Sequence, residues 1–289
     1  MGEVRVYGHF IDGKWVSPKE DEWILRHYPA NGELIAKFPN GTAHEMEQAI
    51  EAAKKAFHGE WPEWSPRERS RLLLEISRRI RDNVDRLAKM ESEEVGKPID
   101  LARGDVIGAA DHFEYAAALT RDLVGETQFL DQNLSAIVVR EPVGVVGLIT
   151  PWNFPIGILC QKLPYALASG NTVVVKPSEF TSSTTFELAA IAYEAGLPPG
   201  VVNVVSGYGN VVGSALAASD DVDKISFTGS TVTGRKILQA AAGNIKKVSL
   251  ELGGKSPSIV FPEADMERTV DGVLHAICFM QGECCVAGS

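Results

Sequence analysis

The feature that most constrains the fold of this chain is a regular alternation of apolar runs and helical segments between residues 143 and 252. The runs are almost wholly apolar, and glycine or proline ends several of the segments between them. Apolar strands separated by helices are typical of a parallel sheet that is covered on both faces. We expect strands at 145–149, 172–176, 201–205, 224–227 and 248–251, and helices at 155–168, 182–194, 211–218 and 231–241.

The chain before residue 143 has a different pattern. Between residues 5 and 39, short apolar runs alternate with turn pairs such as Asp12-Gly13 and Asn31-Gly32, which predicts short strands. Residues 124–141 hold two further apolar runs around a polar turn, and we expect a two-stranded arm away from the core. Helices are expected at 44–57 and at 102–119. A third helix is expected between them, beginning at a capping box formed by Ser65 and Glu68 and ending at Gly96.

Composition and charge exclude several classes of function. The chain has 289 residues and a formal net charge of −10, and it contains no basic run, so we expect no nucleic-acid partner. The apolar runs are too short to span a bilayer and no secretory signal is visible, so we expect no membrane association. Four cysteines without framework spacing fit a reducing compartment, and a cytoplasmic location is expected. The six histidines show no ligand spacing, so no metal site is predicted.

The residues with unusual chemistry follow the expected strands. Ligands of a parallel sheet bind beyond the carboxyl ends of its strands. Four segments should therefore lie along one rim: Thr150 to Phe154, Lys176 to Glu179, Thr228 to Ser230, and Glu251 to Gly253. Most of the functional groups of this chain are thus predicted to meet at one edge.

Each of these segments also has a simpler interpretation. Lys176 and Glu179 are spaced to hold the two ribose hydroxyls of an adenosine, and an acid there favours NAD over NADP, yet a surface charge pair is an equal alternative. The glycine that follows the strand at 224–227 lets a helix N-terminus approach a phosphate, and an ordinary strand–helix turn explains it as well. Asn153, between two prolines, is either an oxyanion donor or a turn residue.

Two adjacent cysteines, Cys284 and Cys285, lie in a loop of small residues near the end of the sequence. A thiolate is a strong nucleophile at neutral pH, and a carboxylate such as Glu251 activates a water that later attacks a thioester. The alternative is that these cysteines are small buried hydrophobes. Cys160 and Cys278 lie in apolar helical context and are assigned to packing.

Taken together, these segments resemble the aldehyde dehydrogenase superfamily of the NAD-dependent, hydrolytic type. The resemblance covers nearly the whole chain, and its motifs occur in the family's order. They are Phe10 to Trp15, Pro151 to Pro155, Lys176 to Glu179, Phe227 to Thr231, Leu250 to Lys255, and Gly282 to Cys285.

The resemblance implies a role for each site residue. Cys285 is the nucleophile, Glu251 the general base, and Asn153 with the Cys285 backbone N–H the oxyanion hole. An aldehyde becomes a carboxylate through a thiohemiacetal and a thioester, with NAD as the hydride acceptor and NADP as the less favoured cofactor. The cofactor-binding residues that it implies are Ile149, Thr150, Pro151, Trp152, Lys176, Ser178, Glu179, Gly209, Phe227, Thr228, Gly229, Ser230, Leu252 and Gly253.

The resemblance also implies an α/β architecture with three parts. An open parallel-sheet, Rossmann-like NAD-binding domain with N-terminal helices is expected at 1–123 and 142–252. Residues 124–141 are expected to be an oligomerisation arm of a homo-oligomer, a dimer or tetramer. Residues 253–289 would begin a second α/β catalytic domain, whose remainder the family has and this chain lacks. The substrate is expected to be a small-molecule aldehyde, with Phe154, Tyr115 and Ile158 as candidates for its tunnel.

The chain departs from the family pattern at Met280, where Asn is usual, and at Glu283, where Gln is commoner. Because of the expected truncation, the alternative function is a catalytically inactive cofactor-binding or regulatory fragment of that family. A dehydrogenase that transfers the acyl group to CoA is a third class, and Glu251 counts against it. A phosphate-hydrolysing enzyme is disfavoured because Arg235-Lys236 breaks the P-loop spacing.

Overall fold

The computed structural model describes residues 3–18 and 22–288. Its central sheet combines a parallel part with two antiparallel N-terminal strands, in the spatial order β12–β11–β8–β9–β10–β2–β3. The expected α/β class with an open parallel sheet is confirmed. The strands are β2 (His9–Ile11), β3 (Lys14–Val16), β8 (Val145–Ile149), β9 (Thr172–Lys176), β10 (Val202–Val204), β11 (Lys224–Gly229) and β12 (Lys247–Leu252).

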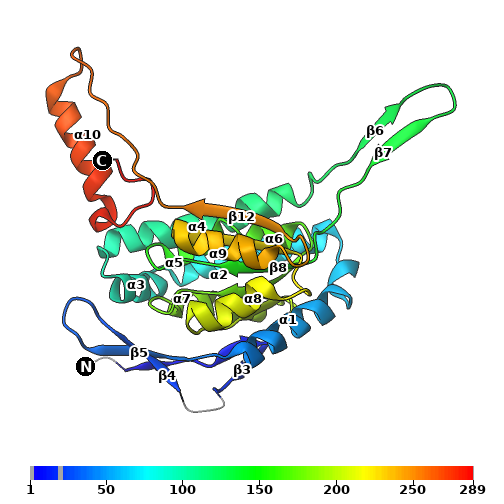
Figure 1. Ribbon diagram of the computed structural model, residues 1–289, viewed down its shortest axis with the longest axis horizontal. Coiled ribbons are helices and arrows are strands. Elements are labelled where there is room, and N and C mark those ends of the chain that lie inside the picture. The colour runs from blue at the N-terminus through cyan, green and yellow to red at the C-terminus, as the bar shows by residue number, and fades with distance from the viewer. Residues whose placement is uncertain (1–2, 19–21, 289) are drawn as a thin grey trace.

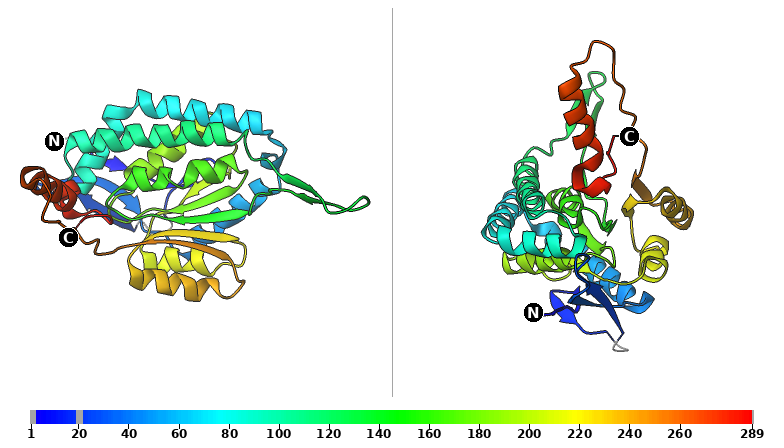
Figure 2. Two further views of the ribbon diagram at one scale, coloured as in Figure 1. Left: turned by 90° about the horizontal axis from the view of Figure 1, so that it is seen from above. Right: turned by 90° about the vertical axis from the view of Figure 1, so that its left-hand side faces the viewer.

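Helices cover both faces of this sheet (Figure 2). Successive residues of a strand point to opposite faces, so Val146 and Leu148 of β8 belong to one core cluster while Val145 and Ile149 belong to the other. The first cluster packs against α2 (Pro66–Asp82), α3 (Val84–Val95), α4 (Ile99–Leu119), α5 (Pro155–Cys160), α6 (Leu163–Ala168) and α7 (Ser183–Glu194). The second packs against α1 (Ala43–Phe57), α8 (Ser214–Ala218) and α9 (Thr231–Ala241).

Local sequence signals explain where two of these helices begin. Ser65 caps α2 and Glu68 returns a bond to the Ser65 backbone, with Pro66 in the first turn, as the sequence predicted. Thr42 and Glu45 form a second capping box at the start of α1. A capping side chain of this kind stabilises a helix by about 1 kcal/mol.

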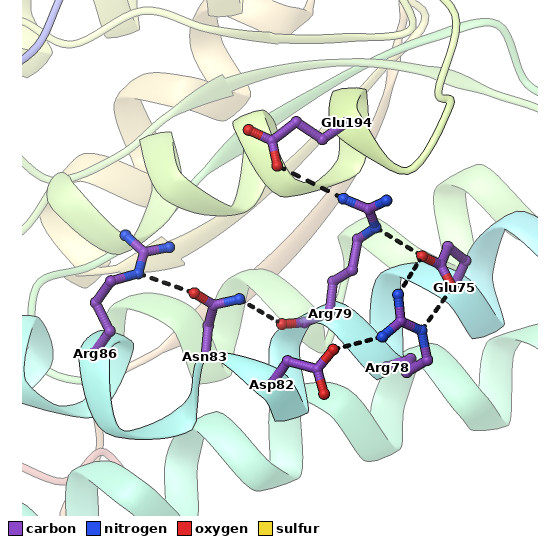
Figure 3. A network of polar contacts seen from close by, with 7 residues as sticks. All are labelled: Glu75, Arg78, Arg79, Asp82, Asn83, Arg86 and Glu194. Atoms are coloured by element: carbon purple, nitrogen blue, oxygen red, sulfur yellow. Dashed lines mark hydrogen bonds and ion pairs between the residues drawn. The ribbon is translucent and has the colours of Figure 1, made fainter.

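The single helix expected from Ser65 to Gly96 is wrong, because α2 and α3 meet at Asn83 (φ −113°, ψ 15°). The Asn83 side chain replaces the interrupted backbone pattern: its Nδ2 donates to the Arg79 carbonyl at 2.9 Å, and its Oδ1 accepts from Arg86 Nε at 3.0 Å. Figure 3 shows this network, which continues through Arg79 to Glu75 and Glu194. The predicted stop at Gly96 is confirmed, with a left-handed φ of 86°.

Two further helices differ from the prediction. The expected helix at 155–168 is two helices, α5 and α6, because Pro164 lacks an N–H and its ring would clash with the carbonyl of residue 160. The expected helix at 211–218 begins as a π-helical turn, Gly209–Gly213, and becomes α8 only afterwards. The π-helical turn lies at the rim where the site residues gather, because Gly209 lines the same cleft.

Residues 124–141 form the expected two-stranded arm, with β6 (Glu126–Phe129) paired antiparallel to β7 (Ser135–Val138). Figure 1 shows this hairpin projecting from the body of the molecule. Its apolar side chains face solvent: Phe129 is 85% exposed and Ile137 70%.

A smaller three-stranded sheet and the C-terminal segment complete the described chain. The small sheet has the order β1 (Arg5–Val6), β5 (Leu34–Pro39), β4 (Trp23–His27). After β12 the chain leaves the body, forms α10 (Met266–Cys278), which contains no buried residue, and returns through a 3-10 turn, Phe279–Gly282 (Figure 1). No helix in the described residues is long and apolar enough to cross a membrane.

Candidate functional site

A cleft of about 510 Å³ lies beyond the carboxyl ends of β8, β9, β11 and β12. The strand order changes direction here, since β9 and β10 continue on one side of β8 while β11 and β12 continue on the other. Every residue that the sequence predicted for the site lines this cleft: Ile149, Thr150, Pro151, Trp152, Asn153, Lys176, Ser178, Glu179, Gly209, Phe227, Thr228, Gly229, Ser230, Glu251, Leu252, Gly253 and Cys285.

A larger cavity of about 660 Å³ lies between α1 and the β2–β3 hairpin. Both basic and acidic side chains line this cavity, and it contains none of the predicted site residues. We therefore place the candidate site in the smaller cleft, where a thiol, an amide and a carboxylate occur together.

Lys176 ends β9, and its Nζ lies 3.0 Å from Glu179 Oε2. The Lys176 side chain is only 5% exposed and that of Glu179 25%. The pair is therefore largely buried, and its role in holding a ribose stays a prediction. The pair offers one ammonium and one carboxylate to a ligand in the cleft.

The start of α9 forms the next part of the cleft wall. Ser230 caps this helix, with its Oγ accepting from the Thr233 N–H at 3.2 Å. Thr228 Oγ1 is buried and has no hydrogen-bond partner among the described residues. A second cavity of about 370 Å³ adjoins the cleft, with which it shares Ile149, Glu179, Gly209 and Thr233.

Asn153 connects two loops that are far apart in the sequence. Its Nδ2 donates to the Glu283 carbonyl at 2.6 Å, which joins the loop after β8 to the loop that carries the cysteines. An amide nitrogen carries two N–H groups, so one remains for a ligand.

Cys285 is exposed at the cleft, and Cys284 beside it is half-buried. Partial burial raises the pKa of the Cys285 thiol, and the neighbouring Cys284 raises it further. The packing assignment holds for Cys160, which is fully buried, but it is wrong for Cys278, which is exposed on α10.

Glu251 lies on β12, exposed, where it also lines an adjoining cleft of about 420 Å³. Lys162 lies in that second cleft, and its Nζ donates to Ser226 Oγ at 2.9 Å. Burial lowers the pKa of Lys162, and the Glu251 carboxylate opposes that effect. Glu251 therefore connects the two clefts.

Some lining residues were not predicted as site residues, among them Phe180, Thr233, Gly282, Glu283 and Cys284. Thr233 was detectable, because a residue three after a helix cap faces the same turn. Of the candidates for the substrate tunnel, Ile158 lines the cleft. The Phe154 ring stacks on the Phe279 ring, with 6.3 Å between the ring centres, and Tyr115 is 60% exposed on α4. Among the described residues, no group of three or more His, Cys, Asp or Glu side chains is placed to hold a metal ion.

Comparison with known proteins gives one consistent result. Residues 15–289 match the profile of the aldehyde dehydrogenase family. The chain is 44% identical over 283 residues to a betaine aldehyde dehydrogenase of Bacillus subtilis (strain 168), a match that covers 97% of this chain and 58% of the relative. The chain thus spans less than three fifths of the length of that relative.

Solved structures agree with this comparison. The crystal structure of an NAD-dependent aldehyde dehydrogenase from Sinorhizobium meliloti superposes with a TM-score of 0.97 at 45% identity, over 99% of this chain and 58% of that one. A structure described as an NADP dependent enzyme of E. coli superposes with a TM-score of 0.95 at 37% identity, over 99% of this chain and 59% of that one.

Proposed function

This chain belongs to the aldehyde dehydrogenase family, and on that basis we propose that it contributes an NAD-dependent oxidation of a small-molecule aldehyde to a carboxylate. The observation that carries the proposal is the cleft itself. A thiol, an amide and a carboxylate from three separate segments line it together with a lysine–glutamate pair.

The cleft has room and suitable groups for a dinucleotide. Two adjoining cavities of about 510 and 370 Å³ offer a place for each end of the cofactor, and the unpartnered Thr228 hydroxyl is a free hydrogen-bonding group in the larger one. Lys176 and Glu179 would hold the adenosine ribose, and Gly229 and Ser230 at the N-terminus of α9 would lie by the pyrophosphate. The remaining lining residues of β8, β11 and β12 would contact the rest of the cofactor.

The proposed reaction begins when the Cys285 thiol loses its proton to solvent and the resulting thiolate attacks the aldehyde carbon. The oxygen becomes negatively charged, and the second N–H of Asn153 together with the Cys285 backbone N–H would stabilise it. When bound, NAD would accept a hydride from that carbon and leave a thioester. Glu251 would then take a proton from the water that cleaves the thioester to a carboxylate and the free thiol.

A second candidate is a chain that binds the cofactor without turnover. The raised pKa of Cys285 favours it, since little thiolate is then present at neutral pH. α10, which precedes the cysteine loop, contains no buried residue and gives that loop little packing support, which also favours the second candidate.

Aldehyde-dependent formation of NADH, followed by absorbance, separates these candidates. Under the first proposal Cys285→Ser abolishes NADH formation while NAD binding persists, and Cys278→Ser, an exposed thiol outside the cleft, changes neither. NAD binding with no NADH formation from any aldehyde by the unchanged chain would favour the second candidate.

We also propose that the arm at 124–141 joins copies of this chain into a dimer or tetramer, since its apolar side chains are exposed. The segment 253–289 would belong to a catalytic domain distinct from the NAD-binding domain at 1–123 and 142–252. Four free cysteines support a reducing location such as the cytoplasm.

A further inference from the structure

A buried lysine lies directly behind the site and has no part in the proposed chemistry. Lys97 follows the C-cap Gly96 of α3, and its side chain is 0% exposed. Its ammonium lies 2.7 Å from Asp105 Oδ2 of α4 and 3.4 Å from Glu91 Oε2 of α3. It also lies 5.0 Å from the centre of the Phe154 ring. A buried charge in such a position is costly unless it is paired, so its contacts deserve a structural explanation.

These contacts fix the loop that carries Asn153. The Lys97 ammonium faces the ring of Phe154, the residue directly after Asn153, in a cation–π arrangement. Glu91, the partner of Lys97, accepts from the Ile156 backbone N–H at 2.7 Å and from Thr184 Oγ1 at 3.1 Å. Both the ammonium and its counter-ion therefore hold the residues that immediately follow Asn153.

The cysteine loop is attached to the same place. Gln281 Nε2 donates to the Gly96 carbonyl at 2.8 Å, next to Lys97, and Phe279 stacks on Phe154. Glu283 is a third acid that the charge of Lys97 affects, although no ion pair among the described residues joins these two side chains. Burial raises the pKa of Glu283, and Lys97 opposes that effect.

We propose that Lys97 is a positioning residue, whose buried ammonium holds the Asn153 loop and the Cys285 loop in one fixed relation. The inference rests on the proposed function, in which these two residues act on the same carbonyl. A buried ion pair contributes little net stability compared with apolar residues of the same volume. Its effect here is on geometry, because the ammonium contacts α3, α4 and the Asn153 loop at once, and the cysteine loop bonds to the carbonyl of the adjacent Gly96.

The test measures alkylation of Cys285 by iodoacetamide in the full 289-residue chain, with peptide mapping to locate the label. Lys97→Met should release the cysteine loop and leave the Cys285 thiol less buried. Because the sulfur is then more accessible to the reagent and burial no longer raises its pKa, we expect alkylation to be about threefold to tenfold faster. Affinity for NAD, measured by calorimetry, should stay unchanged.

Two comparisons separate positioning from a general loss of structure. Lys89→Met removes an exposed lysine of α3, the helix that precedes Lys97; its side chain is 71% exposed, and the change should leave alkylation unchanged. In an Asn153→Ala background, Lys97→Met should add less acceleration than in the unchanged chain, because the bond from Asn153 to the Glu283 carbonyl, one of the attachments between the two loops, is already lost. If Lys97→Met does not fold, Lys97→Met with Asp105→Asn removes one charge of each sign and is measured in the same way.

An unchanged rate of Cys285 alkylation in a folded Lys97→Met variant would overturn the proposal. A loss of NAD affinity as large, in fold-change, as the change in alkylation rate would also overturn it. Additive effects of Lys97→Met and Asn153→Ala would also overturn it. The proposed function fails by a different result, namely a label on Cys284 rather than Cys285 in the unchanged chain.

Discussion

Two buried titratable groups should give this protein opposing pH dependences of stability. Glu94 of α3 is 1% exposed, and its carboxylate accepts from the Ser183 hydroxyl and, at 3.2 Å, from the Ser183 N–H. Burial raises its pKa from 4.5 to about 7, while Ser183 and Arg5 oppose the rise. His9 of β2 is 0% exposed, and neither ring nitrogen has a hydrogen-bond partner among the described residues. Burial lowers its pKa from 6.5 to about 4.

The signs follow from which state holds the proton. Between pH 4.5 and pH 7 the native Glu94 is protonated and the unfolded one is not, so stability falls as pH rises. Between pH 4 and pH 6.5 the unfolded His9 is protonated and the native one is not, so stability rises with pH. Each interval spans 2.5 pH units, and at about 1.4 kcal/mol per unit each corresponds to about 3 kcal/mol. In the unchanged protein the two contributions largely cancel between pH 4.5 and 6.5.

Removing either group should reveal the other. Glu94→Gln should give a free energy of unfolding that rises with pH relative to the unchanged protein, by about 3 kcal/mol from pH 4.5 to 7. His9→Leu should give a free energy of unfolding that falls as pH rises, relative to the unchanged protein. Urea titrations at stepped pH, followed by tryptophan fluorescence, yield the difference curves, with Glu47→Gln on the exposed face of α1 as the control. A flat difference curve for Glu94→Gln would refute the reasoning.

Three further outcomes test other parts of the structure. The chain should bind NAD more tightly than NADP, and Glu179→Gln should narrow the gap, because the 2′-phosphate no longer meets a carboxylate; equal affinities by calorimetry in the unchanged chain would contradict this. Phe129→Asp on the arm should lower the assembly mass in light scattering, whereas Val232→Asp, 62% exposed on α9, should not. Ile245 has a φ of 56° and is 89% exposed, so Ile245→Asn should stabilise the protein by about 1 kcal/mol. Ile259→Asn, at a site 72% exposed and without a positive φ, should not raise the melting temperature.

The sequence was most informative where local chemistry and tertiary burial agree. β8 and β9 have the predicted limits because their residues are mostly apolar and all are buried. The limits of α9 also agree, because Ser230 is a helix cap of a preferred type. Since the carboxyl ends of parallel strands share one edge, these elements bring the predicted residues that follow β8 and β9 and precede α9 to one cleft, whereas Cys285 reaches it through the segment after β12.

The interruptions of helices were harder to predict. An Asn at position 83 lies within an unbroken apolar stripe, and its role depends on bonds to Arg79 and Arg86 that periodicity does not contain. Pro164 was a visible signal for the break between α5 and α6, but the apolar pattern on either side outweighed it. Lys97 gave no signal, because a lysine between a C-cap glycine and a proline is ordinarily solvated. Its burial follows from Glu91 and Asp105, which lie on two different helices.

The two sides of the site therefore depend on different kinds of support. Lys176 and Thr228 lie on strands that are buried in the main core, whereas α10, which precedes the cysteine loop, has no buried residue. In the turn that follows α10, Met280 and Gln281 have φ values of 51° and 55°, a left-handed region that costs a non-glycine residue about 1–2 kcal/mol. The compensation is local: Met280 is 1% exposed and Gln281 donates to the Gly96 carbonyl. The position of Cys285 thus rests on a few contacts around Lys97, and for that reason we expect it to be more sensitive than cofactor binding to changes there.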